Sequence, residues 1–169
     1  RAQQKRGHEV TVVFPPQGKN YNRLVSDGIP AVALPVRSGK LDYFAALKLA
    51  RIIRSRKIDI LHAHLTSSAL LGSAAARWAG VPCVASVLKM TKKRHYMKCG
   101  ALLPCSDAVR DDLLAQGVPP EMMRRIYTGV DIARITAGRA APDKPRAEFG
   151  YSPQHKVIAS IARLAPMKG

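Results

Sequence analysis

The sequence predicts an α/β protein built on a Rossmann-like, doubly wound parallel sheet. Short apolar segments alternate with segments of helical periodicity or small-residue composition, and Gly or Pro marks most of the boundaries. This alternation favours parallel strands, because right-handed crossover helices then cover both faces of the sheet. A chain of 169 residues, 47% of them hydrophobic, can bury one domain core and contain the start of another.

The first elements are predicted to be the end of a helix and two strands. Residues 1–6 supply the last turns of the helix, and Gly7 supplies its left-handed terminator. Residues 8–14 form the first strand, and residues 29–34 form the second after a loop with Gly and Asn. The basic loop 37–40 follows at the carboxyl end of the second strand.

A long helix is predicted over residues 41–57. Its apolar residues recur at helical spacing and define the face expected to be buried, at positions 41, 44, 45, 49, 52 and 53. Lys48, Arg51 and Arg54 lie on the other side, so we expect a cationic outer face.

A strand and a helix are predicted next, and the residues expected at the start and at the end of the helix are both present. Residues 58–64 predict a strand. Thr66 or Ser67 is expected to cap a small-residue helix that ends at Ala79, because Gly80 follows directly.

Four further elements complete this block. Residues 83–88 and 101–105 predict strands, and the basic loop 89–98 joins them. Ser106 is expected to cap the helix that follows the second of these strands. Residues 125–127 predict the last strand.

The alternation of predicted strands and helices ends near residue 131, and the residues that follow are mostly Ala, Gly, Pro and charged residues. We therefore expect residues 1–131 to form one domain and residues 132–155 to form a connector. Residues 156–169 predict the beginning of a second α/β domain, with an apolar strand at its start.

A basic turn follows that last predicted strand. Open α/β sheets bind ligands at the carboxyl ends of their strands, so Arg163 and Lys168 are candidate phosphate ligands. The alternative is that both are solvated surface cations.

Charge and composition limit the class of partner. Lys and Arg number 28 against 11 Asp and Glu, and the formal net charge of +17 attracts nucleic acid, anionic membranes or phosphorylated substrates. Only 5% of residues are aromatic, which disfavours single-stranded nucleic acid, whose bases stack on aromatic rings. No apolar run reaches the roughly 18 to 20 residues that span a bilayer, and the first residues lack the apolar core of a signal peptide.

The three cysteines, Cys83, Cys99 and Cys105, contain no CxxC pair. We expect reduced thiols in a cytoplasmic protein, with neither a disulfide framework nor a metal site.

Six short motifs, each weak alone, occur in the order found in one family. They are residues 6–13 (RGHEVTVV), 59–64 (DILHAH), 79–82 (AGVP), 106–109 (SDAV), 128–131 (TGVD) and 163–169 (RLAPMKG). The chain thus resembles retaining GT-B glycosyltransferases, the glycosyltransferase group 1 or family 4-like enzymes. The resemblance implies an amino-terminal, acceptor-side domain without its first strand, followed by the first strand of the donor domain. We therefore expect a fragment, inactive alone, with a gap in its sheet ladder.

The resemblance also implies site residues and substrates. Arg163 and Lys168 match the family residues that bind the diphosphate of a nucleotide-sugar donor, so transfer with retention is expected to need no metal and no other cofactor. The loop containing Arg37 and Lys40 is expected to meet a glycan or lipid-linked acceptor of the cell envelope, such as lipopolysaccharide. Lys93 falls where some relatives place a cation facing the acceptor or phosphate.

The histidines at the end of the strand 58–64 are further candidates. Alternation places His62 and His64 on one face, where both could line the cleft, although a structural hydrogen-bonding role is the alternative. We assign the catalytic contact to His64, which lies closest to the carboxyl end. No third metal ligand stands nearby in the sequence.

One departure from the family pattern bears on the sugar contact. Leu88 stands where relatives carry a His that touches the donor sugar, and His95 in the following loop is a candidate substitute. An altered acceptor chemistry or a decaying gene would also account for the change.

We expect a glycosyltransferase at the inner face of the cytoplasmic membrane, held as a peripheral protein by its basic faces, with no nucleic acid partner. A nucleotide-sugar epimerase of the same fold and a non-enzymatic polyanion-binding module are the alternatives.

Overall fold

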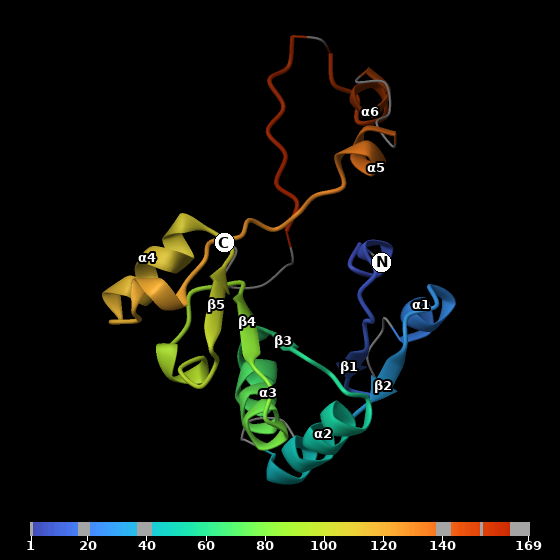
Figure 1. The fold of residues 1–169 in the computed structure, drawn as a ribbon. Coiled ribbons are helices and arrows are strands. Elements are labelled where there is room, and N and C mark those ends of the chain that lie inside the picture. Colours follow the sequence, from blue (N-terminus) through green and yellow to red (C-terminus); the bar gives the residue numbers. More distant parts are fainter. Residues whose placement is uncertain (1, 17–20, 37–41, 138–142, 153, 163–169) are drawn as a thin grey trace. The chain divides into compact units, whose positions relative to one another are not determined.

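The computed structural model describes residues 2–16, 21–36, 42–137, 143–152 and 154–162. The chain divides into two compact units, residues 1–128 and residues 129–169. The first unit contains the strands found in the described residues (Figure 1).

The strands form two parallel sheets, and this confirms the predicted α/β class. They are β1 (Val12–Phe14), β2 (Ala31–Ala33), β3 (Leu61–His64), β4 (Cys83–Val87) and β5 (Ala101–Pro104). One sheet has the order β1-β2 and the other the order β3-β4-β5. In register, Val12 lies opposite Ala31 and Leu61 lies opposite Cys83.

The predicted sheet, in whose ladder a gap was expected, is divided between β1 and β3 into two sheets. The Val12 N–H donates to the Pro30 carbonyl and the Leu61 N–H to the Pro82 carbonyl. Because backbone groups alternate along a parallel strand, those of Val13 and His62 point away from β2 and β4. Both residues line a cavity of about 560 Å³ between the two sheets. The cavity thus lies where a sheet ladder would otherwise continue.

The helices lie between the strands and after them. They are α1 (Tyr21–Ser26), α2 (Tyr43–Ser55), α3 (Leu65–Ala79), α4 (Asp107–Ala115), α5 (Ile132–Ala137) and α6 (Asp143–Glu148), with the 3-10 turns η1 (Gln4–Arg6), η2 (Lys93–His95) and η3 (Pro120–Met122). Gly7 adopts φ of 84° after η1, which confirms the predicted left-handed terminator. Gly80 follows the last residue of α3 as predicted, and its φ is 79°. The short helix α1 was not predicted.

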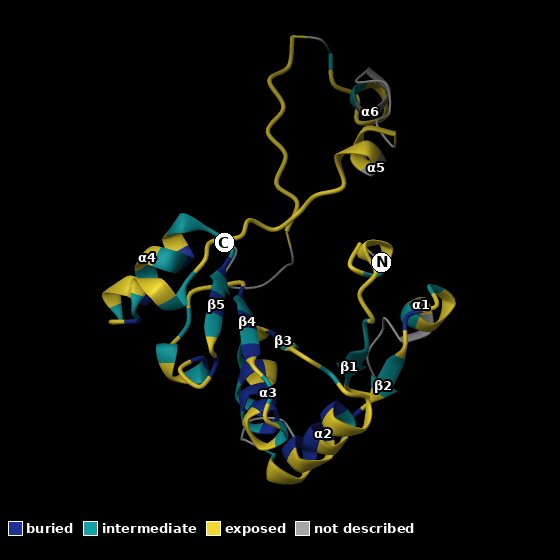
Figure 2. Cartoon of the chain, in the orientation of Figure 1, coloured by how far each residue is buried: buried dark blue, intermediate teal, exposed yellow. Residues whose placement is uncertain are grey.

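Two clusters of buried residues hold the first unit together. Figure 2 colours the buried residues along the ribbon dark blue. The larger one surrounds β4 and β5 and includes Val87, Leu102 and Leu113. The second lies between α2 and α3 and includes Leu49 and Leu71. Burial of such apolar surface is the main favourable contribution to folding.

The buried face of α2 differs from the predicted one. Its buried residues are Ala45, Ala46, Leu49, Ala50 and Ile53. Phe44, predicted to be buried, is 82% exposed. Asp42 begins the helix by accepting a 3.0 Å hydrogen bond from the Ala45 N–H. That start places the stripe of small residues against the core and turns Phe44 outward.

Helix α3 begins earlier than predicted. Its N-cap is His64, which makes no side-chain capping hydrogen bond, and not Thr66 or Ser67. The chain turns directly from β3 into the helix through Leu65, whose φ is 69°. Because that turn is complete at Leu65, Thr66 and Ser67 already belong to the first helical turn.

The strand predicted at residues 125–127 does not form. The Arg124 N–H donates to the Leu102 carbonyl (2.9 Å) and the Ile126 N–H to the Pro104 carbonyl (3.0 Å), so this segment runs beside β5. A parallel ladder would also need the N–H of residue 104 to donate to the Arg124 carbonyl. Proline has no N–H, so the pairing is reduced to an isolated bridge at Met123.

The second unit contains α5 and α6 but no strand in its described residues. The predicted apolar strand is irregular as far as residue 162, with Ile158 97% and Ile161 100% exposed. A strand needs a paired neighbour, and the described part of this unit supplies none. The basic turn that follows, with Arg163 and Lys168, lies outside the described residues.

Candidate functional site

A pair of histidines marks the carboxyl end of β3. His62 and His64 are exposed while Ala63 between them is buried, so alternation places both imidazoles on one face, as predicted. Their rings stack with centroids 4.3 Å apart and an interplanar angle of 29°. Both residues line the cavity.

His62 is held by a neighbour on β4. Its Nε2 atom lies 2.8 Å from the Ser86 hydroxyl, and β3 pairs with β4 so that the two strands set this distance. Burial lowers the pKa of His62 below its ordinary value, and the charge of His64 lowers it further. The neutral form of His62 is therefore favoured, and it can exchange a hydrogen bond with Ser86.

His64 lies where β3 turns into α3. Leu65 has a left-handed backbone, a conformation that costs a non-glycine residue about 1 kcal/mol or more and that often occurs at functional sites. The Ser68 hydroxyl donates to the carbonyl groups of His64 and, at 3.2 Å, of Leu65. These hydrogen bonds fix the turn that presents the His64 imidazole.

The polar part of the cavity wall comes from the start of α3 and from the end of β4. Thr66, Ser67 and Ser68, at the start of α3, and Lys89, after β4, are among the residues that line it. The first N–H groups of a helix favour anions. Imidazoles, hydroxyls and a cation can together hydrogen-bond a sugar or bind a negatively charged group.

Sequence reasoning named the basic loop 89–98 but did not single out Lys89 as a site residue. The sequence did contain a sign that Lys89 belongs to the site, because this residue closely follows the carboxyl end of β4. Neighbouring parallel strands end at the same edge of a sheet, which brings this residue to the cavity lined by His64.

The structure does not bring Lys93 or His95 to this cavity. The Lys93 N–H donates to Gln116 Oε1 (2.7 Å), and the Gln116 amide donates to the Thr91 carbonyl (2.9 Å). His95 Nδ1 lies 3.3 Å from the Thr91 hydroxyl. These contacts fasten the loop to the end of α4. A role for Lys93 and His95 in acceptor binding stays a prediction.

Of the other candidate residues, four lie outside the described part of the chain. These are Arg37, Lys40, Arg163 and Lys168. Their assigned roles therefore also stay predictions.

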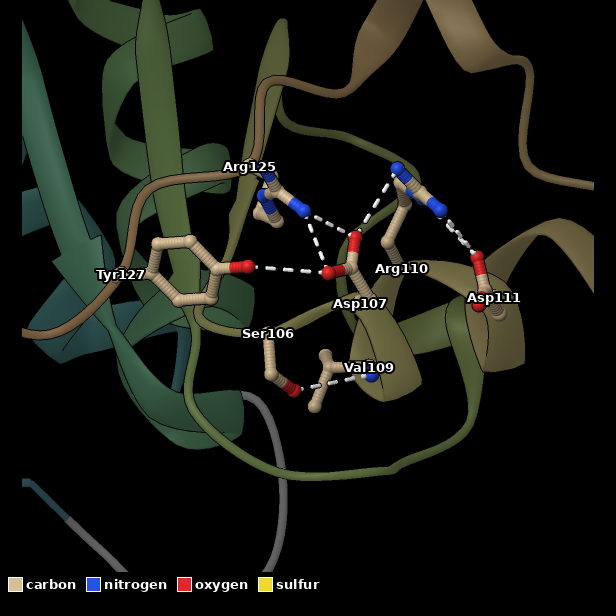
Figure 3. A network of polar contacts seen from close by, with 7 residues as sticks. All are labelled: Ser106, Asp107, Val109, Arg110, Asp111, Arg125 and Tyr127. Carbon is tan, nitrogen blue, oxygen red and sulfur yellow. Dashed lines mark hydrogen bonds and ion pairs between the residues drawn. The ribbon is translucent and has the colours of Figure 1, made fainter.

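A polar network that the sequence analysis missed lies at the carboxyl end of β5 (Figure 3). Ser106 caps α4 as predicted, accepting from the Val109 N–H at 3.3 Å. Asp107 accepts from the Arg125 guanidinium and, at 3.0 Å, from the Tyr127 hydroxyl. The Arg125 guanidinium lies 4.5 Å from the centroid of the Tyr127 ring.

The network ties residues that are 18 and 20 positions apart, which no local pattern indicates. The hydrogen bond from Arg125 lowers the pKa of Asp107 most, followed by the one from Tyr127. Asp107 therefore joins the start of α4 to the segment that leads out of the first unit.

Neither a metal cluster nor a membrane span is evident in the described residues. Among them, no three His, Cys, Asp or Glu side chains gather as they would to ligate a metal ion. No helix built from them has the length and apolar character needed to cross a bilayer.

Residues 1–134 match the model of a protein family described as Glycosyltransferase Family 4. A relative from Escherichia coli, UDP-Gal:alpha-D-GlcNAc-diphosphoundecaprenol alpha-1,3-galactosyltransferase, is 26% identical over 145 residues. That match covers 75% of this chain and 38% of the relative. The chain thus spans well under half the length of this relative.

Solved structures share the fold. A glycosyltransferase from Rickettsia africae superposes with a TM-score of 0.69 at 17% identity, covering 90% of this chain and 44% of that one. Anabaena Alr3699/HepE, crystallised with UDP, superposes with a TM-score of 0.64 at 18% identity, covering 83% of this chain and 42% of that one. At these identities the likeness concerns the fold alone.

Proposed function

Because this chain belongs to Glycosyltransferase Family 4, we propose that its protein transfers a sugar from a nucleoside-diphosphate donor to a glycan or lipid-linked acceptor. The proposed transfer retains the anomeric configuration and uses no metal ion. The observation that carries the proposal is the stacked pair of His62 and His64, which opens onto a cavity at the carboxyl end of β3.

His64 is the proposed contact to the reacting sugar. It stands at the start of α3, where the Leu65 turn fixes its backbone, and His62 stacks against its ring. An imidazole there can exchange hydrogen bonds with a sugar hydroxyl. His62 is the positioning residue, because its own Nε2 is engaged by Ser86.

Arg163 and Lys168 are the proposed ligands of the donor diphosphate, on the strength of the family resemblance. As the sugar–phosphate bond breaks, negative charge gathers on the leaving nucleoside diphosphate. A guanidinium fork and an ammonium group stabilise that charge, which is the role a metal ion plays in other phosphate chemistry. Lys89 adds a further cation on the side of the cavity.

The proposed acceptor is an envelope glycan or a lipid-linked precursor, as in lipopolysaccharide assembly, at the inner face of the cytoplasmic membrane. The name of the Escherichia coli relative, which specifies a diphosphoundecaprenol-linked acceptor, supports this class. Arg37, Lys40, Lys93 and His95 remain the proposed acceptor-binding residues. We also propose that residues 1–169 are inactive alone, because the resemblance places the nucleotide-sugar pocket in a second domain.

The test is sugar transfer by the full-length protein from a nucleotide sugar to a lipid-linked acceptor. We expect turnover that persists in EDTA, a product with the donor's anomeric configuration by NMR, and a loss of about tenfold in kcat for His64→Ala, the size expected for one lost hydrogen bond to the sugar. His8→Ala, an exposed histidine ahead of β1, is the matched control and should keep full activity. Equal rates for His64→Ala and the parent protein, or epimerised donor in place of a transfer product, would contradict the proposal.

A further inference from the structure

Two buried thiols lie in contact inside the first unit. Cys83 begins β4 and is 4% exposed, and Cys99 precedes β5 and is 3% exposed. The Cys83 thiol donates a hydrogen bond to the Cys99 sulfur at 3.7 Å, across 16 positions of sequence. No sequence pattern indicated this pair, because the fold and not local spacing brings the two residues together.

Backbone hydrogen bonds hold both thiols in place. The Gly100 N–H donates to the Cys83 carbonyl at 2.8 Å, which fixes the residue after Cys99 against the start of β4. The Cys99 N–H donates to the Tyr96 carbonyl at 2.9 Å, and the Tyr96 side chain is buried in the same core cluster. A disulfide bond is about 2 Å long, so a small movement of either side chain would bring the two sulfur atoms to bonding distance.

The two thiols differ in acidity. The hydrogen bond from Cys83 lowers the pKa of Cys99, although burial acts in the opposite direction. The same hydrogen bond, together with burial, raises the pKa of Cys83. The thiolate is the reactive form of cysteine, so Cys99 is the first nucleophile of the pair and Cys83 is the thiol that reacts second.

We propose that Cys83 and Cys99 are an oxidation site, at which hydrogen peroxide converts the two thiols reversibly to a disulfide within the folded chain. Hydrogen peroxide is the proposed oxidant because a small molecule needs the least opening of the core to reach the Cys99 sulfur. The Cys99 thiolate attacks one peroxide oxygen, the O–O bond breaks, and hydroxide leaves while the sulfur becomes a sulfenic acid. Cys83 then gives its proton to the sulfenic hydroxyl and attacks the Cys99 sulfur, which forms the S–S bond and releases water. Two thiols and one peroxide thus yield one disulfide and two waters.

The disulfide would close a ring over the basic loop 89–98. That ring runs from β4 through Lys89, which lines the cavity, and through η2 back to Cys99. A cross-link removes conformations of the unfolded chain, so a ring of this length should lower the equilibrium constant for unfolding roughly a hundredfold. The dithiol does not depend on the proposed sugar transfer, because both residues belong to the core cluster around β4 and β5 and their oxidation is measured with neither donor nor acceptor present.

The test is peptide mapping of the 169-residue chain after treatment with a low molar excess of hydrogen peroxide and alkylation of the remaining thiols in urea. We expect a cross-linked peptide that contains Cys83 and Cys99 and that dithiothreitol separates. The oxidised chain should also need more urea to unfold than the reduced chain. Cys99→Ser removes the first nucleophile and should leave the Cys83 thiol free for alkylation. Cys105→Ser removes the third, partly exposed thiol, and this matched control should form the cross-link as the parent chain does.

Three results would overturn the proposal. They are the absence of a cross-link between Cys83 and Cys99, Cys99 that accumulates as sulfinic acid while Cys83 stays a thiol, and an oxidised chain that unfolds as readily as the reduced one. Circular dichroism checks that each variant is folded. If Cys99→Ser unfolds, the peptide map and the urea unfolding of the parent chain still decide the question, because neither measurement needs a substitution.

Discussion

The imidazole rings of His62 and His64 stack at a centroid distance of 4.3 Å because β3 presents alternate residues to one face. Ser86 on the neighbouring strand holds His62, and the turn into α3 holds the backbone of His64. Two elements of the fold thus set the position of one ring pair. A one-residue shift in the register of β3 would send both rings to the buried side.

His62 should make folding stability depend on pH. Its pKa is lowered in the folded chain, so below the unfolded value of about 6.5 the unfolded chain binds more protons and stability falls as pH falls. We expect urea unfolding at pH 7.5, 6.5 and 5.5 to show this loss in the parent chain and a smaller one in His62→Gln. His8→Gln should retain the slope. An identical slope in His62→Gln would show that His62 titrates alike in both states.

Leu102 should be among the residues on which stability depends most. It is fully buried in β5, inside the larger core cluster. Leu102→Ala leaves a cavity and should reduce the free energy of unfolding by roughly 2 to 5 kcal/mol. Leu114→Ala, at a position 38% exposed, should cost less than about 1 kcal/mol. Chemical denaturation of both variants measures the difference, and equal losses would contradict this assignment of the core.

The two expected helix caps should differ in their contribution to stability. Ser106→Ala removes the acceptor of the Val109 N–H and should cost about 1 kcal/mol, whereas Ser106→Asp keeps an acceptor and should recover most of it. Ser67→Ala should change stability by less than about 0.5 kcal/mol, because α3 begins at Leu65. Thermal unfolding of the three variants tests this. A larger cost at Ser67 than at Ser106 would reverse the assignment.

Asp107 should hold the segment of residues 124–127 against β5. Asp107→Asn weakens the contacts to Arg125 and Tyr127, so the Ile126 amide should exchange its hydrogen severalfold faster. Asp111→Asn, which breaks the pair between Asp111 and Arg110, serves as the control. Hydrogen exchange followed by NMR provides the readout. Unchanged exchange at Ile126 would mean that the backbone bonds to β5 suffice.

Sequence reasoning was most successful where local chemistry decides the outcome. Alternation around Ala63 placed His62 and His64 together, and Ser106 was identified as a cap from its position before a helix. Gly7 and Gly80 ended their helices as predicted, because only a residue without a side chain adopts positive φ cheaply.

Sequence reasoning failed where the structure depends on contacts between residues far apart in the chain. Apolar spacing alone assigned Phe44 to the core, although the packing of α2 on α3 buries the adjacent alanines. The composition of residues 125–127 predicted a strand, but Pro104 on β5 has no N–H with which to pair, so the strand does not form. Asp107 pairs with Arg125 across 18 positions, which periodicity does not detect.

The most direct test of the proposed function is a crystal structure of the full-length protein with a bound nucleotide sugar. The account predicts the diphosphate against Arg163 and Lys168 and the sugar within hydrogen-bonding distance of His64. Donor bound with its sugar away from β3 and its diphosphate away from both cations would contradict it.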